Sequence, residues 1–269
     1  MEGVNFSSEA EKGKIAEAKK IIDVARGKGV VLRLIGGLAV RNHCVITYFC
    51  EREYLDIDFV GLASQDNEIT RLFERFGYKE NKNISLASSG WQKQFYKRAL
   101  EDHVDVFLDF LRMEHDINLK NRLSVEDYTI PVSDLLLSKL QIYELNEKDI
   151  RDIITIVKDL PLDKEDKKGV INVKYIAELC SRDWGLHKDV TMNIDRCSDL
   201  VHYYNLTSKE VEKVRNKLSR IKQAIEAAPK TLQWKLRAKI GEKKAWRRTV
   251  EDQKITSVSI EEELKKRKP

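Results

Sequence analysis

Cysteine and proline are scarce in this 269-residue chain, and long apolar runs are missing. The four cysteines (Cys44, Cys50, Cys180 and Cys197) form no CxxC pair and no spacing typical of a zinc site, so they are expected to be reduced thiols. No stretch reaches the roughly 20 apolar residues that a membrane-spanning helix needs. The N-terminal residues also lack the basic and apolar pattern of a secretory signal. Together these absences predict a cytoplasmic protein that does not act at a membrane.

The residues that are abundant suit a folded protein with a heavily charged surface, since 42% of the chain is apolar and 35% is charged. The length suits one substantial core with a smaller helical extension. Segment 161–169 is the best linker candidate, because it combines proline and glycine with a run of charged residues. We therefore predict a core with its helical extension over 1–160 and a basic helical domain over 170–269.

Charge is distributed unevenly along the chain. Residues 1–160 carry a net charge of −4, residues 161–269 carry +9, and segment 209–248 alone carries +10. This segment could attract a polyanion such as tRNA or another RNA, with an affinity that salt would weaken. The alternative is a solvated, lysine-rich helical surface that has no such partner.

Hydrophobic periodicity predicts alternating strands and helices in the first half, which argues for a mixed α/β (α+β) fold with a small sheet. Helices are predicted over 9–26, 38–44 and 66–76, and strands over 30–35, 55–60, 91–96 and 104–108. After residue 131 the apolar pattern is helical, so flanking helices and an all-α C-terminal region are expected. One predicted helix carries an apolar face made of Val211, Val214, Leu218, Ile221 and Ile225.

A pair of carboxylates lies in the predicted strand 55–60. Alternation along a strand puts Asp56 and Asp58 on one face and apolar side chains on the other. Nucleotidyl transfer from a triphosphate needs two divalent ions held close together, and carboxylates at positions i and i+2 can share both. Asp105, flanked by apolar residues in the strand 104–108, could complete the ligand set. The pattern predicts that Asp56, Asp58 and Asp105 are the catalytic residues and bind two Mg²⁺ ions, for which Mn²⁺ could substitute.

Gly36 and Gly37 follow an apolar strand and precede a predicted helix. Because neither residue has a side chain, backbone N–H groups at this turn could approach phosphate oxygens closely. A glycine pair, a carboxylate pair and a single carboxylate, each beside a predicted strand, together favour a site for a nucleoside triphosphate.

These motifs resemble those of a known superfamily. Gly36-Gly37-Leu-Ala-Val-Arg41, Asp56-Ile-Asp-Phe-Val60 and Val104-Asp-Val-Phe107 are similar to the Gly-Gly/Ser…Asp-x-Asp…Asp pattern of the polymerase-β-like nucleotidyltransferases. The most similar subgroup is the AbiEii type, which comprises abortive-infection and toxin–antitoxin nucleotidyltransferases. The resemblance spans residues 30–157 and implies the nucleotidyltransferase fold, magnesium, an NTP such as ATP, and an antitoxin partner.

Two further residues receive roles only through this resemblance. Asp134-Leu-Leu-Leu-Ser-Lys139-Leu and Lys148-Asp-Ile-Arg-Asp152-Ile are similar to later motifs of the AbiEii type. They imply that Lys139 lies near the triphosphate and that Asp149 lies in the same cleft. The chain also departs from the family, because the interval 38–55 is longer than usual and Gly37 stands where many relatives have serine.

Two hypotheses for the function follow. In the first, a metal-dependent nucleotidyltransferase moves an NMP from an NTP to an acceptor hydroxyl on an RNA 3′ end, a protein or a small molecule, with a toxin-like role. In the second, the same fold binds a nucleotide or RNA without catalysis. The intact set of Asp56, Asp58 and Asp105 favours the first, since a degenerate site commonly loses one of these carboxylates.

Overall fold

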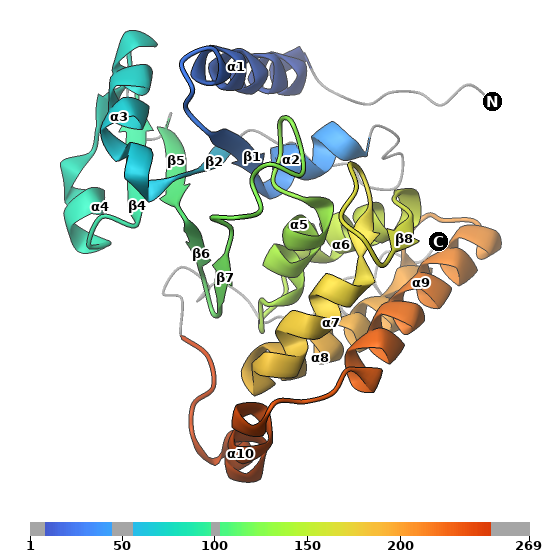
Figure 1. Cartoon of the computed structure of the whole chain (residues 1–269). Coiled ribbons are helices and arrows are strands. Elements are labelled where there is room, and N and C mark those ends of the chain that lie inside the picture. The colour runs from blue at the N-terminus through green and yellow to red at the C-terminus, as the bar shows by residue number, and fades with distance from the viewer. Residues whose placement is uncertain (1–8, 45–55, 98–102, 249–269) are drawn as a thin grey trace.

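The computed structural model describes residues 9–44, 56–97 and 103–248 of the chain. A five-stranded sheet lies on one side of the molecule and a group of helices lies on the other (Figure 1). In their order within the sheet, the strands are β1 (Leu32–Ile35), β2 (Ile57–Gly61), β5 (His103–Leu108), β4 (Gln92–Tyr96) and β3 (Lys79–Glu80). This arrangement confirms the predicted mixed α/β fold with a small sheet, flanking helices and a helical C-terminal region.

The sheet is mixed because β2 and β5 run parallel, whereas the other neighbouring pairs are antiparallel. A parallel pair needs a long crossover, and here α3 (Asp66–Arg75), β3, α4 (Lys82–Ala87) and β4 lie between the two strands in sequence. The parallel register places Asp58 beside Asp105. On the other side of β2, the pairing with β1 places Ile35 beside Asp58.

One face of the sheet is apolar. Phe59 of β2 and Phe95 of β4 are fully buried on this face and pack against Phe73 of α3. The rings of Phe73 and Phe95 are stacked, with centroids 4.5 Å apart. Helix α1 (Glu9–Arg26) contacts β1 and buries Ile21 and Ile22. Because side chains alternate along a strand, Asp58, Gln92, Gln94 and Asp105 lie on the opposite face. Lys93 of β4 is the polar exception, since its Nζ donates to Thr70 of α3 at 2.8 Å on the Phe95 side.

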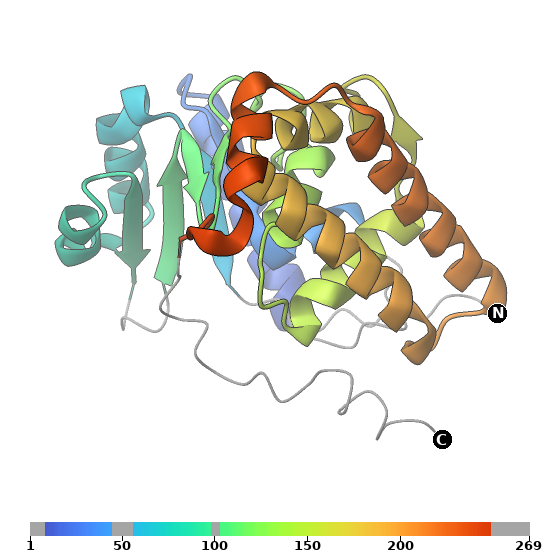
Figure 2. The same ribbon diagram turned by 90° about the horizontal axis from the view of Figure 1, so that it is seen from below.

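The helical half follows a two-stranded hairpin of β6 (Phe110–Arg112) and β7 (Asp116–Asn118). Helices α5 (Val132–Leu140) and α6 (Glu147–Asp159) pack against α2 (Gly36–His43), which begins directly after β1. The remaining long elements are α7 (Val173–Arg182), α8 (Trp184–Leu200), α9 (Ser208–Ala227) and α10 (Leu232–Ile240). Short 3-10 turns occur at η1 (Ala63–Gln65), η2 (Val201–Tyr203) and η3 (Gly241–Lys243). Figure 2 shows the helical half beside the sheet from a second direction.

Local sequence explains where these helices begin. The side chain of Asn146 accepts a hydrogen bond from the backbone N–H of Asp149 at 3.0 Å, which caps α6. Thr207 and Glu210 form a capping box at the start of α9. The predicted apolar face of α9 is confirmed, because Val214, Leu218, Ile221 and Ile225 are fully buried and the helix packs against α6, α7 and α8.

A buried ion-pair network holds α5 against α7. Arg122 donates from Nε to Oδ2 of Asp134 at 3.0 Å, and its guanidinium also binds Asp166. Tyr175 of α7 donates its hydroxyl to the other oxygen of Asp134 at 2.6 Å. Burial raises the pKa of Asp134 to about 6, although Arg122 and Tyr175 favour the charged form. The network therefore fixes the helix that carries Lys139.

The predicted linker 161–169 contains β8 (Leu162–Asp163), which pairs in parallel with β9 (Ile171–Asn172). Helices α5 and α6 contact α7, α8 and α9 on the other side of this segment. Buried apolar residues from both predicted domains also join one cluster. The division into two domains stays a prediction.

The features that the sequence lacks can be compared with the structure over its described residues. Cys44, Cys180 and Cys197 are buried and free, as expected for reduced thiols, and Cys50 lies outside the described residues. Among the helices of the described ranges, none combines the length and the apolar character that crossing a bilayer requires.

The last described residues return to the β6–β7 hairpin. The indole N–H of Trp246 donates to Asp189, at 3.0 and 3.1 Å from the two carboxylate oxygens. His115, in the hairpin turn, has Nε2 2.8 Å from Oδ2 of Asp189. Asp189 is fully buried, so these two contacts compensate for its lost water. The backbone N–H of Arg248 also donates to the carbonyl of Glu114 at 3.1 Å, so this segment fastens α8 to the hairpin.

Replacing Trp246 with phenylalanine should lower the free energy of unfolding by about 1–3 kcal/mol, because the ring remains while buried Asp189 loses a donor. Trp234→Phe is the matched control, since the indole N–H of Trp234 has no hydrogen-bond partner within the described structure. The control should change stability little. Urea unfolding of both variants measures the difference, and equal losses would contradict a stabilising Trp246–Asp189 hydrogen bond.

Candidate active site

The three predicted carboxylates gather on the polar face of the sheet. Asp58 and Asp105 are register partners on neighbouring parallel strands, so their side chains leave the sheet on the same side. Asp56 immediately precedes β2 and is exposed. Both Asp56 and Asp105 act electrostatically on Asp58. The structure thus brings together the carboxylates that the sequence pattern selected.

Asp58 lies in the least favourable position for a negative charge. Burial raises its pKa, and the charges of Asp105 and Asp56 raise it further, to about 7. The positive charge of Lys139 opposes this shift without cancelling it. A carboxyl group with a pKa raised by burial and by like charges is typical of a functional site.

Asp105 is oriented by the neighbouring strand β4. Gln92 and Gln94 both donate from Nε2 to its Oδ1, at 3.2 and 3.4 Å. Its second oxygen, Oδ2, lies 3.4 Å from Nε2 of His103. Burial raises the pKa of Asp105, and the hydrogen bond from Gln92 and the charge of His103 oppose that rise.

The sequence prediction missed the two glutamines. Strand alternation puts Gln92 and Gln94 on one face of β4, which could have been read from the sequence. That this face adjoins Asp105 depends on the β4–β5 register, in which Gln94 lies beside Asp105. No local pattern in the sequence specifies that register.

Two features require a glycine at position 36, the first residue of α2. Its φ of +75° lies in the left-handed region that other residues rarely adopt. A Cβ at this position would also lie 2.7 Å from Oδ2 of Asp58. Gly37 follows in the first turn of α2, and no side chain of the described residues caps this helix start. The N–H groups of the first turn could therefore bind an anion such as a phosphate.

The long interval between the glycine pair and the carboxylate pair does not separate them in space. Residues 9–44 and 56–97 are described, whereas residues 45–55 between them lie outside the described part of the chain. Pairing of β1 with β2 places Ile35 beside Asp58, so Gly36 lies at the carboxylate whatever the length of the connection. The departure from the family spacing thus leaves the predicted juxtaposition intact.

Lys139, near the end of α5, pairs with two carboxylates from α6. Its Nζ lies 2.8 Å from Oδ1 of Asp149 and 3.0 Å from Oδ2 of Asp152. Burial favours the neutral amine, but Asp152 and Asp149 outweigh it and raise the pKa of Lys139. Lys139 is therefore charged, and this charge favours the ionised form of Asp58.

The structure places Lys139 and Asp149 in one cluster, as the resemblance implied, and their contact with a nucleotide stays a prediction. Asp152 was missing from the predicted site although it is fully buried. Its spacing of three residues from Asp149 was the available signal, because residues i and i+3 share one face of a helix.

The donor atoms are compatible with Mg²⁺. Asp58 and Asp105 offer carboxylate oxygens, which hard divalent cations prefer. Over the described ranges, no group of three or more His, Cys, Asp or Glu side chains is arranged so that it could hold a metal ion. Mg²⁺ is commonly bound by one or two carboxylates, with substrate phosphates and water completing its shell. The carboxylates therefore suit a cation that binds together with a triphosphate.

No family model and no curated protein sequence matches this chain. The solved structures that are distantly similar to it include the following two. One is the lincosamide antibiotic adenylyltransferase LnuA bound to lincomycin, with 18% identity over 52% of this chain and 94% of that chain and a TM-score of 0.35. The other is the antibiotic-resistance factor ANT(2″)-Ia, with 10% identity over 72% and 97% of the respective chains and a TM-score of 0.40.

Replacing Gly36 with alanine should disturb the site, and Gly29→Ala provides a matched control. Both glycines have a positive φ, of +75° and +71°, so both variants pay the same backbone strain of about 1–2 kcal/mol. Only the Cβ at position 36 meets Asp58, because nothing lies within 4 Å of one at position 29. In urea unfolding, Gly36→Ala should lose more stability than Gly29→Ala. In nucleotide titration, Gly36→Ala should bind more weakly than the wild type, whereas Gly29→Ala should not. Equal effects of the two variants would contradict the close approach of Asp58.

The stability of the metal-free protein should depend on pH through Asp58. Its pKa is 3.8 in an ordinary setting and about 7 in the folded chain, so the folded state binds more protons between pH 4 and 7. Raising the pH across this window should therefore lower the free energy of unfolding, by roughly 1–3 kcal/mol from this group. Asp58→Asn should remove most of that slope and stabilise the metal-free protein at pH 8. Urea unfolding at pH 5 and pH 8 measures both effects, and an unchanged slope in the variant would disprove the assignment.

Proposed function

We propose that this chain is a nucleotidyltransferase that moves an NMP from an NTP to an acceptor hydroxyl and depends on Mg²⁺ or Mn²⁺. One observation carries the proposal, namely that Asp58, Asp105 and the backbone of Gly36 lie close together. Asp58 and Asp105 are in register on parallel strands, and the backbone of Gly36 passes so close to Asp58 that a side chain would not fit. A carboxylate pair beside an uncapped helix start provides for metal-bound phosphates.

The carboxylates would have two roles in the proposed reaction, binding cations and accepting a hydrogen bond from the acceptor hydroxyl. Asp58 and Asp105, with Asp56 beside them, would contribute carboxylate oxygens to divalent cations whose shell the triphosphate and water complete. When bound, these cations would supply acidification of the acceptor hydroxyl and charge stabilisation of the pyrophosphate. Gln92 and Gln94 occupy Oδ1 of Asp105, so Oδ2, which lies 3.4 Å from Nε2 of His103, would accept the hydrogen bond from the acceptor hydroxyl.

The triphosphate would lie between the start of α2 and the cluster around Lys139. The first-turn N–H groups of Gly36 and Gly37 would bind its oxygens, with the positive end of the α2 dipole adding to the attraction. Lys139 supplies a permanent positive charge near Asp58, held in place by Asp149 and Asp152. Since two carboxylates already neutralise this lysine, we assign it to positioning and screening rather than to neutralising a free phosphate.

The finer features of the function come from the sequence resemblance to the AbiEii type. A toxin-like role and an antitoxin partner are part of the proposal on that basis alone. ATP as the NTP has the same basis, whereas the cytoplasmic site of action was predicted from the scarce, unpaired cysteines and the missing long apolar runs. None of them is needed for the chemistry of the site, so each can fail without removing the proposed transfer reaction.

Incubating the purified protein with α-labelled NTPs, Mg²⁺ or Mn²⁺, and one acceptor class at a time tests the proposal. Total RNA, protein and small hydroxyl compounds are the three classes. We expect label transfer to one class, reduced roughly a hundredfold or more by Asp58→Asn and by Asp105→Asn, because each removes charge that the transition state needs. Asp58→Asn should also leave the metal-free protein at least as stable as the wild type.

Asp116→Asn is the matched control. Asp116 is also a strand carboxylate, but it is exposed on β7 and pairs with Arg248 away from the cluster. Its activity should match that of the wild type. Transfer that survives Asp58→Asn would overturn the site, and nucleotide binding without transfer to any class would favour the non-catalytic module.

A further inference from the structure

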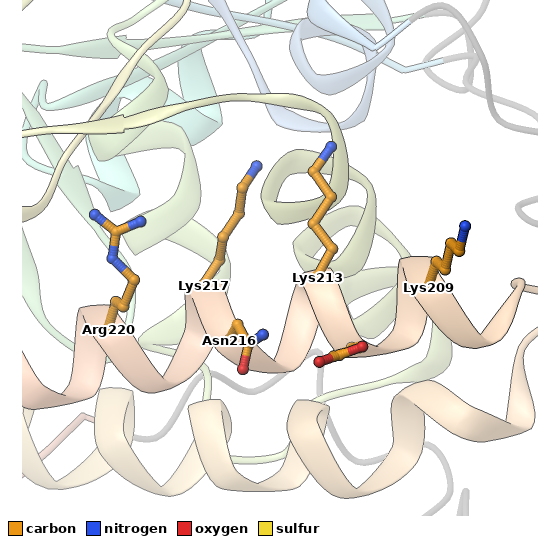
Figure 3. Close-up of a pocket in the computed structure, with 6 residues that line it drawn as sticks. Lys209, Lys213, Asn216, Lys217 and Arg220 are labelled. Atoms are coloured by element: carbon orange, nitrogen blue, oxygen red, sulfur yellow. The ribbon is translucent and has the colours of Figure 1, made fainter.

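A row of cations lies along one side of α9. Lys209, Lys213, Lys217 and Arg220, together with Glu212 and Asn216, line a shallow pocket on this helix. Figure 3 shows the four cationic side chains extending to the same side of α9. Successive lysines are four residues apart, which corresponds to about 6 Å along a helix. We call these four residues the α9 cation row.

Three members of the α9 cation row are exposed and uncompensated. Among the described residues, Lys209, Lys213 and Arg220 have no ion-pair or hydrogen-bond partner. Other cations of the same helix are engaged: Arg215 donates to the carbonyl of Ser198 at 2.9 Å, and Lys222 binds Asp195 at 2.6 Å. The three uncompensated cations therefore lie together on one side of α9, and Lys217 is the member of the row that neighbouring backbone engages.

The fourth member fixes where the row lies. Lys217 donates from Nζ to the carbonyls of Val157 and Leu160, at 2.9 and 2.7 Å, at the end of α6. Burial lowers the pKa of Lys217 to about 8, and the repulsion of Lys213 adds to this, whereas Asp159 opposes it. The row therefore carries a concentration of positive charge that a bound anion would relieve.

Helix α6 links the row to the candidate active site. Its first half carries Asp149 and Asp152, which pair with Lys139, and its end contacts Lys217. The rise from residue 152 to residue 160 is about 12 Å.

We propose that the α9 cation row binds the phosphate backbone of single-stranded RNA. The regular spacing of the cations suits a repeating anion, and no aromatic side chain lines the pocket, so recognition would be of the backbone and not of the bases. RNA is the polynucleotide that offers single strands and free 3′ hydroxyls in quantity in a cell. Resting on the proposed function, we further infer that this RNA is the acceptor whose 3′ end reaches Asp105.

Binding of a 12-nucleotide fluorescent RNA to the full chain tests the surface without catalysis. The triple variant Lys209→Gln/Lys213→Gln/Arg220→Gln should weaken binding at least about tenfold in low salt. It should also reduce the slope of log affinity against log salt by about 2, at about 0.7 per lost contact with a single strand. A variant with unchanged affinity and slope would overturn the proposal.

A second triple variant controls for net charge. Arg215→Gln/Lys222→Gln/Lys230→Gln removes three cations from the same region, but each of these is already bound to Ser198, Asp195 or the end of α9. This control should keep RNA affinity within about twofold, and circular dichroism of both triples confirms that they fold. Equal weakening by the two triples would show general charge attraction and overturn the assigned surface.

Further probes separate RNA from other anionic partners and from the catalytic proposal. Anionic vesicles of phosphatidylserine and a polyglutamate peptide should both bind more weakly than the RNA. If either binds more tightly than the RNA, and this binding is lost in the first triple variant, RNA is not the partner. Asp58→Asn should bind the RNA like the wild type, because the row is separate from the carboxylates. If the chain transfers nucleotides, the first triple should raise the KM for RNA while the KM for NTP stays constant. Row-dependent binding without transfer to RNA would retain the surface and reject the acceptor assignment.

Discussion

Asp58 and Asp105 repel each other, and the sheet prevents them from separating. Their positions are set by the parallel register of β2 and β5, so moving one carboxylate away would break backbone hydrogen bonds. The repulsion and the burial appear directly in the raised pKa of Asp58. Proteins rarely keep such an arrangement in a place where two apolar residues would stabilise the sheet, unless the charges serve a ligand. The rest of the site is understandable as a response to this constraint.

Several neighbours of Asp58 and Asp105 lower the cost of keeping the two carboxylates close together. Gln92 and Gln94 satisfy one oxygen of Asp105, and Lys139 provides a compensating charge near Asp58. The helical half makes this compensation possible, because α5 carries the lysine and α6 carries the carboxylates that fix it. The network of Arg122 and Asp134 then holds α5 in place from the opposite side. Removing the helical half would therefore leave the sheet with an unbalanced pair of charges.

Charge is divided unevenly along the chain. Residues 1–160 carry a net charge of −4 and hold the carboxylates where cations and phosphates would meet, whereas residues 161–269 carry +9. On α9 the basic residues fall into two groups, since Arg215, Lys217 and Lys222 are bound to neighbours, and Lys209, Lys213 and Arg220 are not within the described structure. A net charge counted from the sequence treats these residues alike, although only the second group can attract a partner without breaking a contact.

The sequence alone determined the elements and one face of the site. Period-2 alternation placed Asp56 and Asp58 on one side of a strand, and paired glycines marked the turn, because both signals arise within a few residues of chain. Only the tertiary structure decided that Gln94 adjoins Asp105, that Asp152 joins Asp149 on Lys139, and which cations of α9 are engaged. These outcomes depend on strand register and on helix packing between distant segments, and no local pattern encodes which segment becomes the neighbour of which.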